Sequence, residues 1–257
     1  MPTHPALRIL PTAAEGCEAA AGLIVRGLAA AIEARGVAHW CTTGGSSAPT
    51  IYRALRQPPL RDAVDWSRVH IWWGDDRFVE PDDPLSNVRP FDELLLAPGV
   101  GVGFPDMHIH RIDVAAAMAN GVGPTPCADA YEAELIAEGP PAGPDGIPVF
   151  DVLLMGVGPD GHILSVFPWS PVFDDPGLVS GVAAPEHVLP HVPRVTINPR
   201  LVAAARQVVV VTSGATRAGL LARAWDGGDV RELPVRATLL PQATWVLDEA
   251  AAAELPR

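Results

Sequence analysis

The segment with the clearest catalytic potential is GVGPDGH at 156–162, where His162 follows Asp160 by two positions. Histidine has a pKa near neutrality, so it can act as a general base, and a nearby carboxylate can orient its ring or support its charged form. A lone histidine is more often structural, but this one follows a glycine-rich turn after an apolar run. We therefore predict that His162 and Asp160 are catalytic residues.

Residues 156–161 also fit the GxGxxG pattern of dinucleotide-binding sites. That fingerprint requires a full helix directly after it, and an acidic residue about 20 positions on at the end of the next strand. Here Pro168 interrupts the sequence soon after the motif, and Asp174 and Asp175 lie in a proline-rich stretch. We therefore expect no nicotinamide cofactor.

A second segment, TTGGSSAPT at 42–50, has the composition of an anion-binding loop. Gly44 and Gly45 let the backbone approach a ligand closely, and Ser46 with the free N–H groups of a helix start favours phosphate. The alternative is a plain Gly-Ser turn with a helix cap. Cys41, just before this loop, is expected to be a small buried residue rather than a nucleophile.

Two further segments contribute arginines. The first, WWGDDR, ends in Asp75, an adjoining aspartate and Arg77, and a Ser-Asn pair containing Asn87 follows it. Arg77 could grip a phosphate through its guanidinium fork; the alternative is a solvated turn in which the acids pair with it. The second, TSGATR, places Arg217 in the first turn of an expected helix, where a cation opposes the helix dipole unless an anion lies nearby. The alternative there is a solvated helix arginine.

The elements that must position these side chains alternate along the chain. A helix is expected over 15–36, ending at Gly36. Buried runs of strand length separated by helical patterns indicate βαβ units, and so an α/β fold with a mostly parallel sheet flanked by helices on both faces. The expected strands are 39–42, 69–73, 107–112, 150–157, 208–212 and 245–247, and the expected helices lie near 47–56, 86–96, 127–138, 198–206 and 214–226.

Ligands of such sheets collect at the carboxyl ends of the strands, where the four segments are expected to lie. We expect one domain over 1–257, with loops at 138–148 and 168–193. The second loop is unusually long, so it either folds over the site as a lid or makes a plain surface excursion.

Composition narrows the classes of function. The net charge is −12, from 18 basic and 30 acidic residues, which disfavours nucleic acid and anionic membranes as partners. All basic residues are arginine, which excludes a Schiff-base, pyridoxal phosphate or P-loop lysine.

Three cysteines, no evident signal peptide and no apolar run of membrane-spanning length favour the reducing cytoplasm. No metal is expected, because His108 and His110 share one strand face without a third ligand at the usual spacing. A GxSxG nucleophile elbow is absent as well.

Taken together, the segments resemble the 6-phosphogluconolactonase family, which belongs to a wider group that includes glucosamine-6-phosphate deaminases. The family pattern runs SGGS-x-P, W-x-DER, SN, G-x-GPDGH-x-x-S-x-FP, R-x-T and G-x-x-K. This chain reads TGGSSAP (43–49), WWGDDR (72–77), SN (86–87), GVGPDGHILSVFP (156–168), RVT (194–196) and GATR (214–217).

The resemblance implies a Rossmann-like fold of the sugar-phosphate isomerase/lactonase type, in a monomer or small homo-oligomer. It implies hydrolysis of 6-phospho-D-glucono-1,5-lactone in the oxidative pentose phosphate pathway, without a cofactor. His162 would act as the general base on water. Residues 43–46 would hold the phosphate with Arg77 and Arg217, Arg194 would assist, and Asn87 would bind a sugar hydroxyl.

Four positions depart from the family pattern. Asp76 replaces a glutamate, Ile163 and Leu164 replace small residues, and Arg217 replaces a lysine. An arginine keeps the charge but differs from lysine in reach and geometry, which bears directly on phosphate affinity.

Two alternatives remain open. One is a deaminase, although Arg77 and Asn87 stand where deaminases carry tyrosine, and 166–168 reads VFP where they carry Asn-Glu-Pro. The other is a catalytically silent sugar-phosphate sensor on the same fold.

Overall fold

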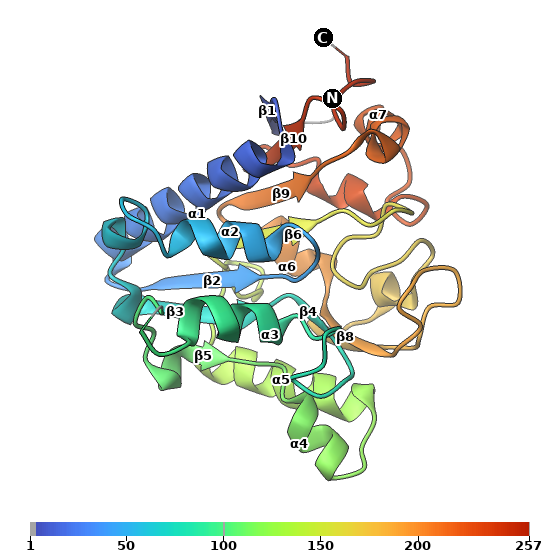
Figure 1. Cartoon of the computed structure of the whole chain (residues 1–257). Helices are drawn as coiled ribbons and strands as arrows, with labels where there is room; N and C mark the ends of the chain where they lie inside the picture. Colours follow the sequence, from blue (N-terminus) through green and yellow to red (C-terminus); the bar gives the residue numbers. More distant parts are fainter. Residues whose placement is uncertain (1–3, 100, 257) are drawn as a thin grey trace.

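The computed structural model of the chain describes residues 4–99 and 101–256. Seven parallel strands form one sheet in the order β1-β10-β9-β6-β2-β3-β5, which confirms the α/β fold expected from the sequence. Figure 1 shows the strands following one another in this order from top to bottom. The strands are β1 (Ala6–Leu10), β2 (Ala38–Thr42), β3 (Val69–Trp73), β5 (Ile109–His110), β6 (Val152–Gly156), β9 (Val208–Thr212) and β10 (Ala243–Asp248).

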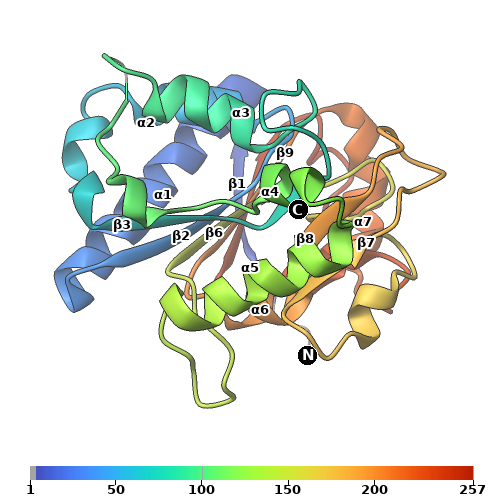
Figure 2. The same cartoon turned by 90° about the horizontal axis from the view of Figure 1, so that it is seen from below.

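Helices cover both faces of this sheet. Figure 2 shows α1, α2 and α3 on one side of the strands and α5 and α6 on the other. The longest helix begins after Thr12, whose hydroxyl accepts the Glu15 N–H, and ends at Gly36 with φ of 79°, as the glycine predicted. The helices are α1 (Ala13–Arg35), α2 (Ala48–Leu55), α3 (Val88–Phe91), α4 (Val114–Ala119), α5 (Pro124–Glu138), α6 (Pro199–Ala204) and α7 (Ala218–Trp225).

The core lies around the central strands. Every residue of β2 and β9 is buried, which explains why these strands read as continuous apolar runs rather than alternating ones. Four tryptophan side chains are fully buried, at positions Trp40, Trp72, Trp73 and Trp245.

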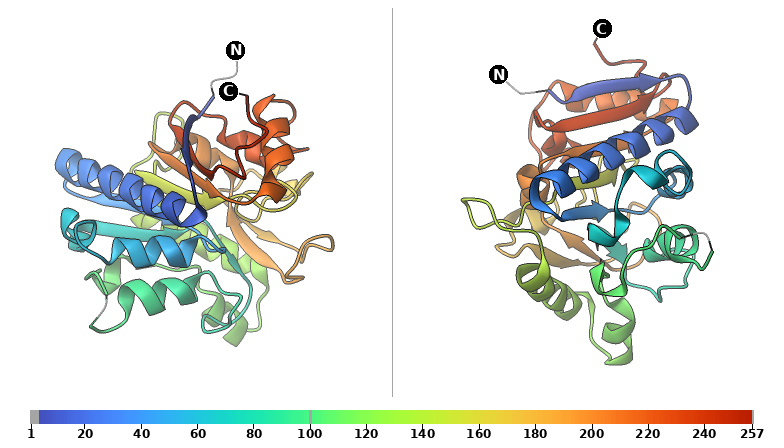
Figure 3. Two further views of the ribbon diagram at one scale, coloured as in Figure 1. Left: turned by 45° about the horizontal axis from the view of Figure 1, so that its top comes forward. Right: turned by 90° about the vertical axis from the view of Figure 1, so that its left-hand side faces the viewer.

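A second sheet was not expected from the sequence. It is antiparallel, with the order β4-β8-β7, and its strands are β4 (Asp75–Arg77), β7 (Val179–Val182) and β8 (Arg194–Ile197). The left view of Figure 3 shows the β7–β8 hairpin, in orange, beside the large sheet. Strands of three or four residues bury too little apolar sequence to produce a periodic signal, so the sequence predicts no separate strand at β4 and a loop over β7.

Several of the predicted strand and helix ranges also differ from those in the structure. The strand expected at 107–112 is only β5, preceded by a 3-10 helix at Asp106–His108. The helix expected near 86–96 divides into α3 and a π-helix at Asp92–Leu96. The 168–193 segment is not a plain loop, because it contains β7 and a 3-10 helix at Pro171–Asp174. The short elements β1 and α4 were not predicted at all.

Four histidines stack at one end of the sheet. The His70 ring lies 4.8 Å from that of His39 and 3.9 Å from that of His108, centroid to centroid, and His70 Nδ1 lies 2.9 Å from His110 Nε2. Glu134 on α5 lies 2.7 Å from His110 Nδ1. Burial, then the neighbouring histidines and Arg35, lowers the pKa of His39 to about 3, and burial with the His108 and His110 charges lowers that of His70 to about 4.

This cluster predicts a loss of stability in acid. Above the unfolded-state pKa of about 6.5 the His39 and His70 rings are neutral in both states, and between that value and their lowered folded-state pKa values only the unfolded chain protonates them, so unfolding is favoured as pH falls. Between pH 6 and 5, the free energy of unfolding in urea should fall less steeply in His39→Gln than in wild type, by up to about 1.4 kcal/mol per pH unit. His191→Gln, at an exposed histidine outside the cluster, is the matched control. Equal slopes in wild type and His39→Gln would contradict the prediction.

Candidate active site

A pocket of about 250 Å³ opens where the three central strands end. Residues following β2, β6 and β9 line it, together with side chains of β4 and β8 from the second sheet. This is the place where α/β sheets bind ligands, and the volume suits one sugar-sized molecule better than a dinucleotide. The predicted site residues that line the pocket are Gly44, Gly45, Ser46, Asp75, Arg77, Asn87, His162, Arg194 and Arg217.

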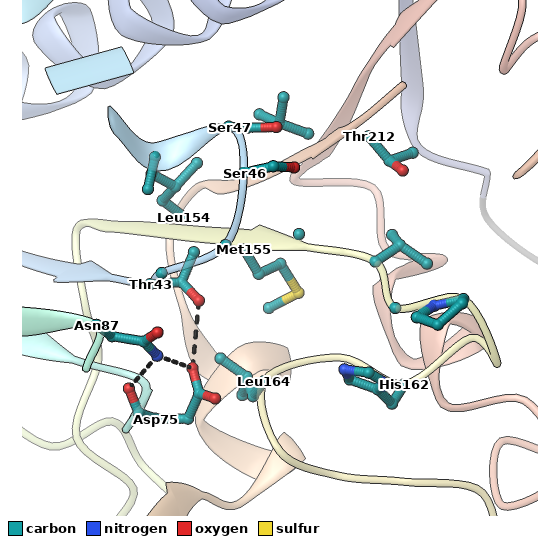
Figure 4. Close-up of a pocket in the computed structure, with 18 of the residues that line it drawn as sticks. Thr43, Ser46, Ser47, Asp75, Asn87, Leu154, Met155, His162, Leu164 and Thr212 are labelled. Carbon is teal, nitrogen blue, oxygen red and sulfur yellow. Dashed lines mark hydrogen bonds between the residues drawn. The ribbon is translucent and has the colours of Figure 1, made fainter. Parts of the chain in front are cut away.

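Asp75 is fixed on one wall of the pocket (Figure 4). Its Oδ2 accepts a 2.7 Å hydrogen bond from Ser165, and its Oδ1 accepts bonds from Thr43 and Asn87 at 3.2 and 3.3 Å. The Asn87 amide also donates to the Asp75 carbonyl at 2.8 Å, and its own Oδ1 is buried without a partner. Both Asp75 and Asn87 are almost fully buried, so this wall of the pocket is rigid.

Arg77 and Arg194 face each other across β4 and β8. They are directly opposite in the antiparallel register, so their side chains leave the same face of the small sheet. Arg77 donates to the Leu85 carbonyl and Arg194 to the Pro190 carbonyl, and the Nε of each is buried without a partner. Burial, opposed by Asp75 and reinforced by the Arg77 charge, lowers the pKa of Arg194. The alternative, in which the neighbouring acids only pair with Arg77, does not hold: no described carboxylate forms a salt bridge with either guanidinium.

The glycine-rich loop and Arg217 also line the pocket, and Gly44 packs against the Asn87 side chain. No acceptor among the described residues receives a hydrogen bond from the backbone N–H of Gly44, Gly45 or Ser46. Ser47 precedes α2 without a side-chain cap, so the simple capped turn is not what forms here. Arg217 donates only at 3.4 Å, to the Val157 carbonyl and to Thr216.

His162 is held by the carboxylate behind it. Its Nδ1 lies 2.5 Å from Asp160 Oδ1, which also accepts the His162 N–H at 3.1 Å. Burial alone would raise the pKa of Asp160, but the hydrogen bonds and charge of His162, with a further bond from His187, hold it well below its usual range. An ionised carboxylate accepts from Nδ1–H, which leaves Nε2 of the neutral ring free to take a proton. Asp160 itself is not among the pocket-lining residues, and it touches the pocket only through His162.

The GxGxxG sequence serves this histidine and not a dinucleotide. A Cβ at Gly158 would collide with the His162 ring, and the Gly158 N–H donates to the His162 carbonyl at 2.8 Å. No helix follows the motif; instead Ile163 and Val166 form an isolated β-bridge. Cys41 is buried, and burial followed by the Asp75 charge raises the pKa of its thiol well above the usual value, as its interpretation as a core residue predicted.

Leu164 is the departure from the family pattern that shapes the pocket. It lines the cavity with φ of 53°, a left-handed conformation that costs a non-glycine residue about 1 kcal/mol. Figure 4 shows its side chain between Asp75 and His162. Ile163 is fully buried in the core and does not reach the pocket.

Sequence reasoning missed the part of the pocket formed by apolar residues. Met155 at the end of β6 carries no motif, and Val188 and Leu189 lie in the long 168–193 segment. That segment therefore does reach the site, as the lid hypothesis requires, while its movement stays a prediction. Within the described residues, no group of three or more His, Cys, Asp or Glu side chains is arranged to hold a metal ion, and no helix is both long and apolar enough to cross a membrane.

Asp76 points to the other side of β4, into the interior. Its Oδ1 accepts the N–H groups of Arg77 and Asn87, both at 2.7 Å, so it positions two pocket residues from behind. Burial, opposed by these two bonds, raises the pKa of Asp76 to about 7. Ionisation of Asp76 near neutral pH therefore opposes folding.

The substitution Asp76→Asn tests this charge. The folded protein keeps the Asp76 proton up to about pH 7 while the unfolded chain loses it near 4, so the wild type loses stability as pH rises between those values. The asparagine side chain would stay neutral, and its amide oxygen would still accept both N–H groups. From pH 5 to pH 8, we expect the variant to gain roughly 2 kcal/mol over the wild type in urea unfolding. A difference that does not change with pH would contradict this.

The geometry agrees with what sequence comparison finds. Residues 11–247 match the family described as glucosamine-6-phosphate isomerases/6-phosphogluconolactonase. The chain belongs to this family. The 6-phosphogluconolactonase of Streptomyces coelicolor is 37% identical over 249 residues, covering 93% of this chain and 90% of that protein.

Two other members of the family are similar over nearly the whole chain. The 6-phosphogluconolactonase of Mycobacterium tuberculosis is 36% identical over 242 residues, covering 93% of this chain and 94% of that protein. The solved structure of 6-phosphogluconolactonase from Trypanosoma cruzi superposes with a TM-score of 0.87 at 25% identity, covering 100% of this chain and 99% of that one. The structural similarity and the sequence similarity therefore indicate the same family.

Proposed function

We propose that this protein is a 6-phosphogluconolactonase, which opens 6-phospho-D-glucono-1,5-lactone with water to give 6-phospho-D-gluconate in the oxidative pentose phosphate pathway. The observation that carries the proposal is the convergence of the His162–Asp160 pair and three arginines on one sugar-sized pocket. The cytoplasm suits such an enzyme, and the three free, buried thiols suit a reducing compartment.

The histidine pair supplies the proton transfers. His162 Nε2 takes a proton from water as the water oxygen bonds to the lactone carbonyl carbon, and Asp160 stabilises the imidazolium that forms. The ring C–O bond then breaks, and His162 returns the proton to the departing ring oxygen.

The arginines and free backbone N–H groups that line the pocket bind the substrate's phosphate. The free N–H groups of the 44–46 loop line the pocket together with Arg77, Arg194 and Arg217. A phosphate held among them fixes the lactone ring over His162, so that binding energy from a remote group serves the reacting one. Asn87 is chiefly a support for Asp75, and its contact with a sugar hydroxyl stays a prediction.

Two assays separate this function from the alternatives that the sequence left open. Release of ammonia from glucosamine 6-phosphate would identify a deaminase. A thermal shift with 6-phosphogluconate, without lactone hydrolysis above the spontaneous rate, would identify a silent sensor. We expect hydrolysis and no ammonia.

Replacing His162 tests the general base. His162→Ala should lower kcat by about 10²–10⁴-fold, because proton transfer in the transition state is lost. Consumption of freshly generated lactone, corrected for spontaneous hydrolysis, measures the effect. His4→Gln, at an exposed histidine outside the pocket, should keep wild-type turnover. An active His162→Ala variant would remove this residue from the mechanism.

A further inference from the structure

A second histidine shares the carboxylate of Asp160. His187 lies in the segment between β7 and β8, and its Nε2 is 2.9 Å from Asp160 Oδ2. The other oxygen, Oδ1, is the one bound to His162 Nδ1 at 2.5 Å. The two imidazoles therefore hold different oxygens of one carboxylate, and the chain order gives no hint of it because the histidines are 25 positions apart.

An aromatic ring packs against both imidazoles. The Phe167 centroid lies 4.7 Å from that of His162 and 5.7 Å from that of His187, the latter in an edge-on arrangement. Phe167 is only 5% exposed, and the Arg194 guanidinium lies 5.2 Å from its centroid. The ring limits where both histidines can turn, which favours Asp160 as their shared polar partner.

Hydrogen bonds to one oxygen restrain the rotation of a carboxylate about its Cβ–Cγ bond only in part, because an oxygen accepts hydrogen bonds over a broad range of directions. The His162 side chain and backbone both bind Oδ1, so a further bond at Oδ2 narrows that rotation. His187 is the partner the structure gives to Oδ2. Small errors in the orientation of a catalytic group lower the rate steeply, so a bond that fixes the carboxylate plane has a direct effect on catalysis.

The same bond holds residues 187–190 beside the pocket. Val188 and Leu189, the residues after His187, line the cavity, and the Pro190 carbonyl accepts from Arg194. His187 itself is largely exposed, with 53% of its side chain accessible, so its removal leaves the core intact.

We propose, building on the lactonase function above, that His187 is a positioning residue: by holding Oδ2 it fixes the plane of Asp160, and Asp160 in turn orients His162 for proton transfer. Its effect therefore falls chiefly on the chemical step. Among the described residues, neither the glycine loop nor Arg77 or Arg217 forms a hydrogen bond with residues 187–190, and Arg194 is held in β8 by its strand pairing.

The test is to measure kcat and KM separately in variants of His187. His187→Ala should lower kcat about tenfold with KM changed less than about twofold, because transition-state geometry is lost while phosphate binding remains. His187→Gln should recover part of the loss, since its amide N–H can donate to Oδ2. Glu186→Ala, at the exposed neighbouring position, is the matched control and should match wild type.

A double variant shows whether the effect passes through Asp160. Added to Asp160→Ala, the His187→Ala change should lower kcat by less than about twofold further, because coupled residues are not additive. The proposal is overturned by a raised KM with unchanged kcat, by unchanged kinetics, or by an equal tenfold loss in the Asp160→Ala background. An inactive wild type would instead overturn the lactonase function itself.

Discussion

Two guanidinium groups held side by side without a salt bridge to a carboxylate are the constraint on which the site depends. Arg194 is 1% exposed, Arg77 lies opposite it, and each has a buried Nε without a partner. Buried like charges are costly unless an opposite charge joins them, and Asp75, the carboxylate that shares their wall, is engaged by Thr43, Ser165 and Asn87. A bound anion would offset the cost of holding these two positive charges together.

The two sheets divide the work of building the pocket. The large parallel sheet ends in turns that bring a glycine-rich loop and a histidine to one edge, as its topology requires. The small antiparallel sheet adds what those turns lack, a rigid wall with charges in register. Alternation along β4 then separates the roles of its residues: Asp75 and Arg77 face the pocket, while Asp76 faces the interior and accepts the N–H groups of Arg77 and Asn87.

Much of this arrangement was predictable from the sequence, because the signals were local. Apolar runs gave the central strands, Gly36 gave a helix end, and glycines beside polar residues marked the turns of the parallel sheet. What sequence reasoning missed was non-local. The strand β4 is too short to show periodicity, and the pairing of Arg77 with Arg194 depends on a register between segments 117 positions apart. His187 sits in a stretch interpreted as a loop, so its contact with Asp160 could be found only in three dimensions.

The most direct test of the account compares lactones with and without a phosphate. If remote binding energy positions the ring over His162 as proposed, kcat/KM for 6-phosphogluconolactone should exceed that for unphosphorylated gluconolactone by about 10²-fold or more, measured above spontaneous hydrolysis. Equal turnover of the two lactones would contradict the account, since the arginines would then hold nothing that the reaction needs.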